Sequence, residues 1–107
     1  MVYIVDDDQN VRDGFMMLLQ SAGFKSSAYE SAEKFLEYYE QNHNHDLLIL
    51  DISLGGMSGC DLMEYLTKRE LHLPVIIITA FDREATRKSA KNYGALAYLR
   101  KPVDSAA

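Results

Sequence analysis

Three short apolar segments rich in β-branched residues limit the folds open to this chain of 107 residues. They cover residues 2–5, 47–50 and 75–78 and show no alternation of polar and apolar side chains. Continuous apolarity over so few residues is typical of strands that are buried on both faces, as in a parallel sheet covered by helices. Two weaker segments, residues 25–29 and 96–99, fit strands nearer the edges of the same sheet.

Four amphipathic segments alternate with these strands. In the first, the spacing of the apolar residues predicts a helix that ends at Gly23; these residues are Val11, Phe15, Leu18, Leu19 and Ala22. Ser31 is placed to cap a second helix, and a third is expected over residues 61–70. Asp82 is expected to cap a fourth helix that ends at Gly94. The alternation of strands and helices predicts a doubly wound α/β sheet of five parallel strands.

The length and charge of the chain exclude several classes of protein. A chain of 107 residues supports one domain. With 11 basic and 16 acidic residues the formal net charge is −5, so we expect no direct binding to nucleic acid or to an anionic membrane. The longest apolar segments are far shorter than the roughly 20 residues of a membrane-spanning helix. The single cysteine, Cys60, cannot form an internal disulfide, which favours a cytoplasmic location.

Polar side chains follow four of the five predicted strands. In open parallel sheets, ligands bind beyond the carboxyl ends of the strands, so these residues are the candidates for a site. Asp8 is expected to begin the following helix and to point elsewhere. The side chains that remain as candidates are Asp6 and Asp7 after the first strand, Asp51 after the third, Thr79 after the fourth and Lys101 after the fifth.

Carboxylates that converge at one edge of a sheet repel one another unless a cation lies among them or some stay protonated. Oxygen ligands without His or Cys select Mg²⁺ or Mn²⁺, and a magnesium ion commonly binds phosphate oxygens as well. A phosphoryl substrate follows, with Lys101 and Thr79 as donors to its oxygens. Asp51 is the best candidate for a nucleophile because it stands alone at the end of the most apolar strand, whereas Asp6 and Asp7 are paired as metal ligands would be.

These residues resemble the receiver (phosphoacceptor) domain of two-component response regulators. The segments that carry the resemblance are Val5-Asp6-Asp7-Asp8, Leu50-Asp51, Thr79-Ala80 and Lys101-Pro102. The match extends over nearly the whole chain, so residues 1–107 are expected to form one receiver domain. The resemblance also implies the flavodoxin-like strand order 2-1-3-4-5.

The resemblance implies a role for each candidate residue. The phosphoacceptor would be Asp51; the ligands of Mg²⁺ would be Asp6, Asp7, Asp51 and the backbone carbonyl of Ser53; the phosphate-binding groups would be Thr79 and Lys101; and the switch residues would be Thr79 and Tyr98. The phosphoryl donor would be a histidine kinase or a phosphotransfer protein. The output would pass to an effector domain or to a homodimer partner.

Two features depart from the usual pattern of the family. Gly55 stands where proline is usual, and we expect a looser loop after the phosphoacceptor because glycine does not fix the backbone. Only residues 101–107 follow the fifth strand, so the final helix is expected to be truncated or absent. The sheet face left open would then favour self-association.

Two alternatives belong to other functional classes. A magnesium-dependent phosphatase or phosphotransferase with an aspartate nucleophile needs a second carboxylate two residues after it, and this chain has Ser53 there. A receiver-like scaffold that works without phosphorylation would have lost an acidic or a phosphate-binding residue, and none is lost. We therefore expect a signalling module that catalyses only its own phosphorylation and dephosphorylation.

Overall fold

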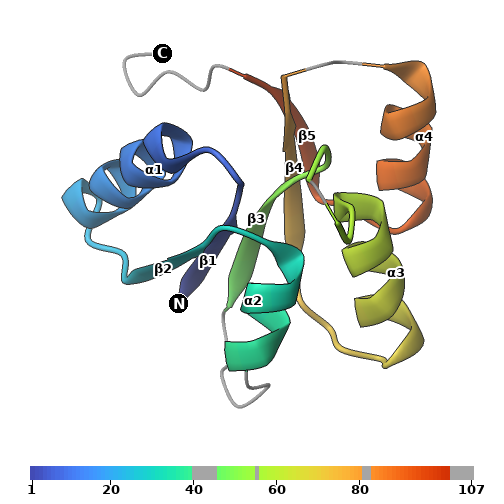
Figure 1. Ribbon diagram of the computed structural model, residues 1–107, viewed down its shortest axis with the longest axis horizontal. Helices are drawn as coiled ribbons and strands as arrows, with labels where there is room; N and C mark the ends of the chain where they lie inside the picture. The colour runs from blue at the N-terminus through green and yellow to red at the C-terminus, as the bar shows by residue number, and fades with distance from the viewer. Residues whose placement is uncertain (40–45, 55, 81–82, 102–107) are drawn as a thin grey trace.

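The computed structural model describes residues 1–39, 46–54, 56–80 and 83–101. Five parallel strands form one sheet in the order β2-β1-β3-β4-β5, as predicted. The strands are β1 (Val2–Val5), β2 (Ser26–Tyr29), β3 (Leu47–Asp51), β4 (Val75–Thr79) and β5 (Ala97–Arg100). The helices are α1 (Gln9–Ser21), α2 (Ala32–Tyr38), α3 (Gly59–Lys68) and α4 (Glu84–Asn92) (Figure 1).

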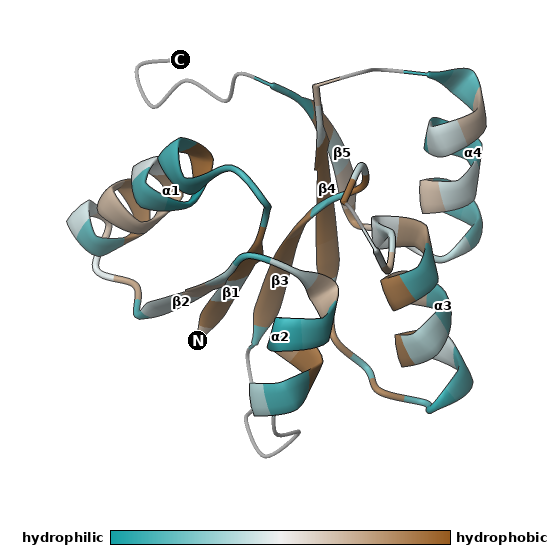
Figure 2. Ribbon diagram, in the orientation of Figure 1, coloured by the Kyte–Doolittle hydropathy of each residue, from teal (hydrophilic) through white to brown (hydrophobic). Residues whose placement is uncertain are grey.

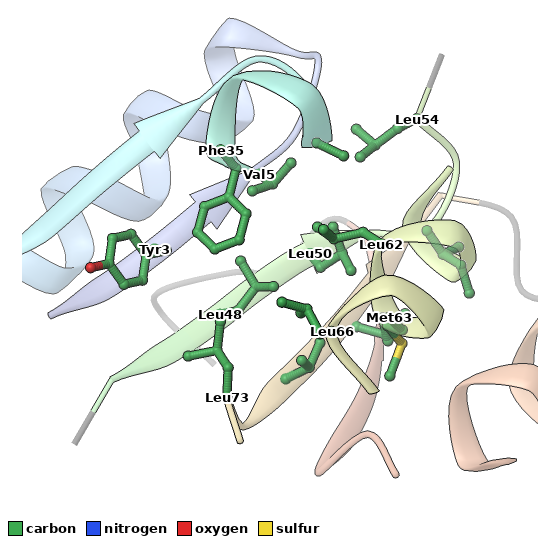
Figure 3. Close-up of a cluster of buried hydrophobic side chains, with 14 of the residues drawn as sticks. Tyr3, Val5, Phe35, Leu48, Leu50, Leu54, Leu62, Met63, Leu66 and Leu73 are labelled. Carbon is green, nitrogen blue, oxygen red and sulfur yellow. The ribbon is translucent and has the colours of Figure 1, made fainter. Parts of the chain in front are cut away.

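The sheet separates two hydrophobic cores. On the face covered by α2 and α3, the side chains of Phe35, Leu62 and Leu66 pack against Leu48 and Leu50 of β3, and all are buried (Figure 3). On the other face, the central strands contribute a smaller cluster against which α1 packs. Figure 2 shows the hydrophobic colour concentrated in the central strands. Burial on both faces explains why these strands are continuously apolar.

The sheet-facing side of α1 differs from the prediction. Val11, Phe15 and Leu19 pack against the smaller core as expected, and Met16 joins them. Leu18, assigned to the same apolar side, is 36% exposed. Phe15 and Leu19 are four residues apart and lie on the side of α1 that faces the sheet. Leu18 precedes Leu19 by one residue, which is about 100° around the helix, so its side chain points away from the centre of that side.

Helix starts follow the capping side chains. Ser31 caps α2 as predicted, since its hydroxyl accepts a hydrogen bond from the backbone N–H of Lys34. Helix α3 begins at Gly59, before the predicted start, because Ser58 and Asp61 form a reciprocal capping box. The predicted cap of α4, Asp82, lies outside the described residues.

At α4, the N-cap position is Arg83, and its side chain makes no capping hydrogen bond. The prediction of an acidic side-chain cap is therefore wrong for this helix.

The expectations for Gly55 and for a missing final helix also concern residues outside the described ranges. Within those ranges, no helix has both the length and the apolarity needed to cross a bilayer.

Gly59 allows the first turn of α3 to lie directly on the chain that leaves β3. A Cβ atom at this position would lie 2.6 Å from the Cα of Ile52 and 2.7 Å from the carbonyl oxygen of Asp51. We expect Gly59→Ala to lower the free energy of unfolding by about 1–3 kcal/mol, because backbone atoms must move to make room.

The matched control for this substitution is Gly14→Ala in α1, where an added Cβ would meet nothing within 4 Å. This change should raise stability by about 0.5–1 kcal/mol, because alanine favours the helix interior. Urea denaturation of both variants checks the pair. A Gly59→Ala protein as stable as the Gly14→Ala protein would show that α3 has room to move.

Candidate functional site

The carboxyl ends of four strands bring the predicted polar residues to one edge of the sheet. Asp6 directly follows β1 and is fully buried, and Asp51 ends β3 with 3% of its surface exposed. Thr79 ends β4 and is fully buried. The backbone N–H of Lys101, the residue after β5, donates to the carbonyl oxygen of Thr79 at 2.7 Å. Parallel pairing of the strands therefore places the carboxylates, the hydroxyl and the ammonium at the same edge.

Three carboxylates form a compact cluster at this edge. One oxygen from each of Asp6, Asp7 and Asp51 lies within 4.8 Å of the other two. Asp6 and Asp51 are buried, whereas Asp7 is exposed, so the cluster is open to solvent on one side. An all-oxygen donor set with this spacing fits a hard divalent cation such as Mg²⁺.

The ammonium group of Lys101 bridges two of these carboxylates. Its Nζ lies 2.8 Å from Oδ2 of Asp6 and 3.1 Å from Oδ2 of Asp51, and its side chain is 17% exposed. Burial lowers the pKa of Lys101, but hydrogen bonds and charge interactions with Asp6 and Asp51 outweigh it, and the net shift is upward. The lysine thus stays charged and supplies part of the positive charge that converging carboxylates require.

Backbone N–H groups orient both buried carboxylates. Oδ1 of Asp6 accepts from the N–H of Asp8 at 2.9 Å, and Oδ1 of Asp51 accepts from the N–H of Ser53 at 3.0 Å. One oxygen of each carboxylate is therefore fixed by its own loop, while the other faces Lys101. The sequence predicts only a carbonyl role for Ser53; the structure adds this contact from its amide.

The comparison with known protein families identifies the family of this chain. The sequence model described as the response regulator receiver domain matches residues 2–107. The chain belongs to this family. It is therefore a receiver domain, a signalling domain of response regulators, and the resemblance inferred from the sequence is confirmed.

Individual relatives agree with the family assignment. The transcriptional regulatory protein TdiR of Thauera aromatica is 33% identical over 101 residues, which are 94% of this chain and 44% of that protein. The structure of the response regulator StyR has a TM-score of 0.89 at 38% identity, covering 98% of this chain and 52% of that chain. A CheY-like receiver domain protein from Methanospirillum hungatei has a TM-score of 0.87 at 28% identity, covering 98% of this chain and 83% of that one. The chain thus spans about half the length of TdiR and StyR.

The third aspartate of the acidic run has a separate position in the receiver domain. Asp8 is the N-cap of α1, and its Oδ1 accepts a hydrogen bond from the N–H of Asn10 at 2.9 Å. The three carboxylates within 4.8 Å of one another are those of Asp6, Asp7 and Asp51. Two adjacent aspartates, Asp7 and Asp8, therefore face different surroundings, as the sequence predicted for Asp8.

Tyr98 of the receiver domain contacts the larger core and α4. Its side chain packs against the larger core, and its hydroxyl lies 2.9 Å from the hydroxyl of Thr86. The guanidinium carbon of Arg87 lies 5.7 Å from the centre of the ring. These contacts connect β5 with α4.

Proposed function

We propose that this receiver domain accepts a phosphoryl group on Asp51 from the phosphohistidine of a histidine kinase or a phosphotransfer protein. The observation that supports this most is the cluster itself: three carboxylates at the ends of β1 and β3 lie within 4.8 Å of one another, and a lysine ammonium bridges two of them. The charge of the described cluster is 3 − 1 = 2 negative charges, counting Asp6, Asp7 and Asp51 against Lys101. A site with this excess of carboxylate that is open to solvent on one side suits a divalent cation.

The proposed ligands of Mg²⁺ or Mn²⁺ are Asp6, Asp7, Asp51 and the backbone carbonyl of Ser53. A bound cation would neutralise the charge on the oxygens of the transferring phosphoryl group. Asp51 contributes the nucleophile, since its Oδ1 is held by the N–H of Ser53 and its Oδ2 faces Lys101.

In the transfer step, a carboxylate oxygen of Asp51 forms a bond to phosphorus as the bond between phosphorus and the histidine nitrogen breaks. The electron pair of that bond stays on the imidazole, and the product is an aspartyl phosphate. Lys101 then moves its ion pair from the carboxylate to a phosphoryl oxygen, and the hydroxyl of Thr79 donates to another. The loss of the Lys101 contact to Asp51 is the local change that the domain transmits.

The output of the proposed switch is a changed surface at α4. Tyr98 already touches Thr86 and Arg87, so a new position of its ring alters what α4 presents. TdiR is named a transcriptional regulatory protein and is more than twice as long as the matched region. We propose that residues 1–107 act as the receiver unit of a longer response regulator, with an effector domain or a second copy as the partner.

The metal part of the proposal is tested with Asp7→Ala and Asp8→Ala. We expect Asp7→Ala to weaken Mg²⁺ binding by about tenfold or more, equivalent to ~1.4 kcal/mol, because it removes a ligand from the cluster. Asp8→Ala removes the cap of α1 and should lower stability by about 1 kcal/mol with little effect on Mg²⁺ affinity. Calorimetric titration with Mg²⁺ and urea denaturation measure both. Equal losses of affinity in the two variants would contradict the assignment of Asp7.

A further inference from the structure

A long-range hydrogen bond ties helix α2 to the loop that follows Asp51. Oε1 of Glu33 accepts from the backbone N–H of Met57 at 3.1 Å, across a sequence separation of 24 residues. Glu33 lies in the first turn of α2. Met57 lies between β3 and α3, in the loop that also carries Ser53. The contact therefore joins the start of one helix to a loop of the proposed site.

Both ends of this loop are held by neighbouring structure. At its start, the N–H of Ser53 donates to Asp51 at 3.0 Å. At its end, the N–H of Gly59 donates to the carbonyl oxygen of Ile52 at 3.3 Å. Among the described residues between them, Ser58 is tied to α3 by its capping box with Asp61, and the N–H of Met57 is tied to α2 by its hydrogen bond to Glu33.

Gly56 lies next to the carboxylate of Glu33. Its φ is +67°, a conformation that residues with a side chain seldom adopt, and a Cβ here would lie 3.0 Å from Oε2 of Glu33. One oxygen of Glu33 thus bonds the N–H of Met57, while the other lies over Gly56. A loop with adjacent glycines loses much conformational entropy on ordering, so an external anchor has a large influence on its position.

We infer that Glu33 is a positioning residue for the phosphorylation site: it holds the loop after Asp51 so that Ser53 can orient that carboxylate and present its carbonyl to the metal. This inference rests on the proposed function for the role of Ser53. It also connects α2 to the site, because anything that displaces the first turn of α2 releases the loop.

The test compares Glu33→Ala, Glu33→Gln and the control Glu37→Ala. Glutamine keeps a side-chain carbonyl that can accept the hydrogen bond but removes the charge. Glu37 lies on the same helix, is exposed, and has no described partner. Two quantities are measured in each protein: the dissociation constant for Mg²⁺ alone, by calorimetry, and the exchange rate of the Met57 amide proton in metal-free protein, by NMR.

We expect Glu33→Ala to raise the Mg²⁺ dissociation constant and the Met57 exchange rate by about three- to tenfold, the range expected for the loss of one hydrogen bond. Glu33→Gln should stay close to wild type in both, and Glu37→Ala should match wild type. Equal weakening by Glu33→Gln and Glu33→Ala would mean that the negative charge attracts the metal, which would overturn the positioning role.

The two measurements also separate this inference from the proposed function. Unchanged Met57 exchange in Glu33→Ala would overturn the inference even if the wild-type protein binds Mg²⁺ well. A wild-type protein that binds no Mg²⁺ would overturn the proposed metal site, and with it the role of Glu33 toward the metal. In that case Met57 exchange still decides whether Glu33 holds the loop.

Discussion

Replacing Lys101 with Met is expected to lower the free energy of unfolding by about 3 kcal/mol in metal-free protein. The ammonium lies 2.8 Å from Asp6 and 3.1 Å from Asp51, and both carboxylates are buried. Methionine fills much of the same volume but leaves these charges without a cation. The control is Lys68→Met, which breaks an exposed ion pair with Glu64 and should leave the urea midpoint near that of wild type.

Two conditions sharpen the expectation for Lys101. Mg²⁺ should stabilise the Lys101→Met protein more than wild type, because the cation need not displace an ammonium there.

The second condition is pH. In wild type, the pKa of Lys101 is raised, so the contribution of its charge to stability is fully present below its ordinary pKa of 10.5 and is lost as the pH rises through the higher folded value. The Lys101→Met protein should lack this alkaline loss. Equal stability of the two proteins at neutral pH without metal would show that the ion pairs contribute nothing.

Asp51→Asn is expected to abolish covalent phosphorylation completely while the fold stays intact. The side-chain amide cannot form an acyl phosphate, but its oxygen can still accept from the N–H of Ser53. Lys101 keeps its contact with Asp6 at 2.8 Å, and one of three converging negative charges is removed. We therefore expect a change in unfolding free energy of less than about 1 kcal/mol.

The check on this variant is incubation with Mg²⁺ and a small acyl phosphate donor, followed by intact mass measurement and urea denaturation. Wild type treated in parallel supplies the positive control. An Asp51→Asn protein that still gains a full phosphoryl group would place the phosphoacceptor elsewhere. A variant that fails to fold would show that Asp51 is needed for structure beyond the contacts described.

Much of the fold could be predicted because the strands are buried on both faces. Continuous apolar segments located β1, β3 and β4, and the helical patterns between them required parallel pairing. The same logic located the cluster, since residues that directly follow parallel strands meet at one edge. For this reason, the sequence predicts that Asp6 and Asp51 lie close together.

Details that depend on single contacts could not be predicted in the same way. The expected repulsion among carboxylates called for a cation, and the sequence assigned Lys101 to a phosphate oxygen; in the structure Lys101 also pairs with Asp6 and Asp51. The contact between Glu33 and Met57 joins residues 24 positions apart, and no periodicity connects them. Its only local signal was the pair of glycines before Met57, which indicated a loop with unusual backbone freedom.

The central claim, that Asp51 receives the phosphoryl group, is tested most directly by locating the label in the wild-type protein. The protein is incubated with Mg²⁺ and a small acyl phosphate donor and then digested with a protease at low temperature. The peptides are analysed by fragmentation mass spectrometry. We predict one phosphoryl group per chain, on Asp51, removable by hydroxylamine as an acyl phosphate is. A phosphoryl group on Asp6, Asp7 or any hydroxyl side chain, or no gain of mass with Mg²⁺ present, would contradict the account.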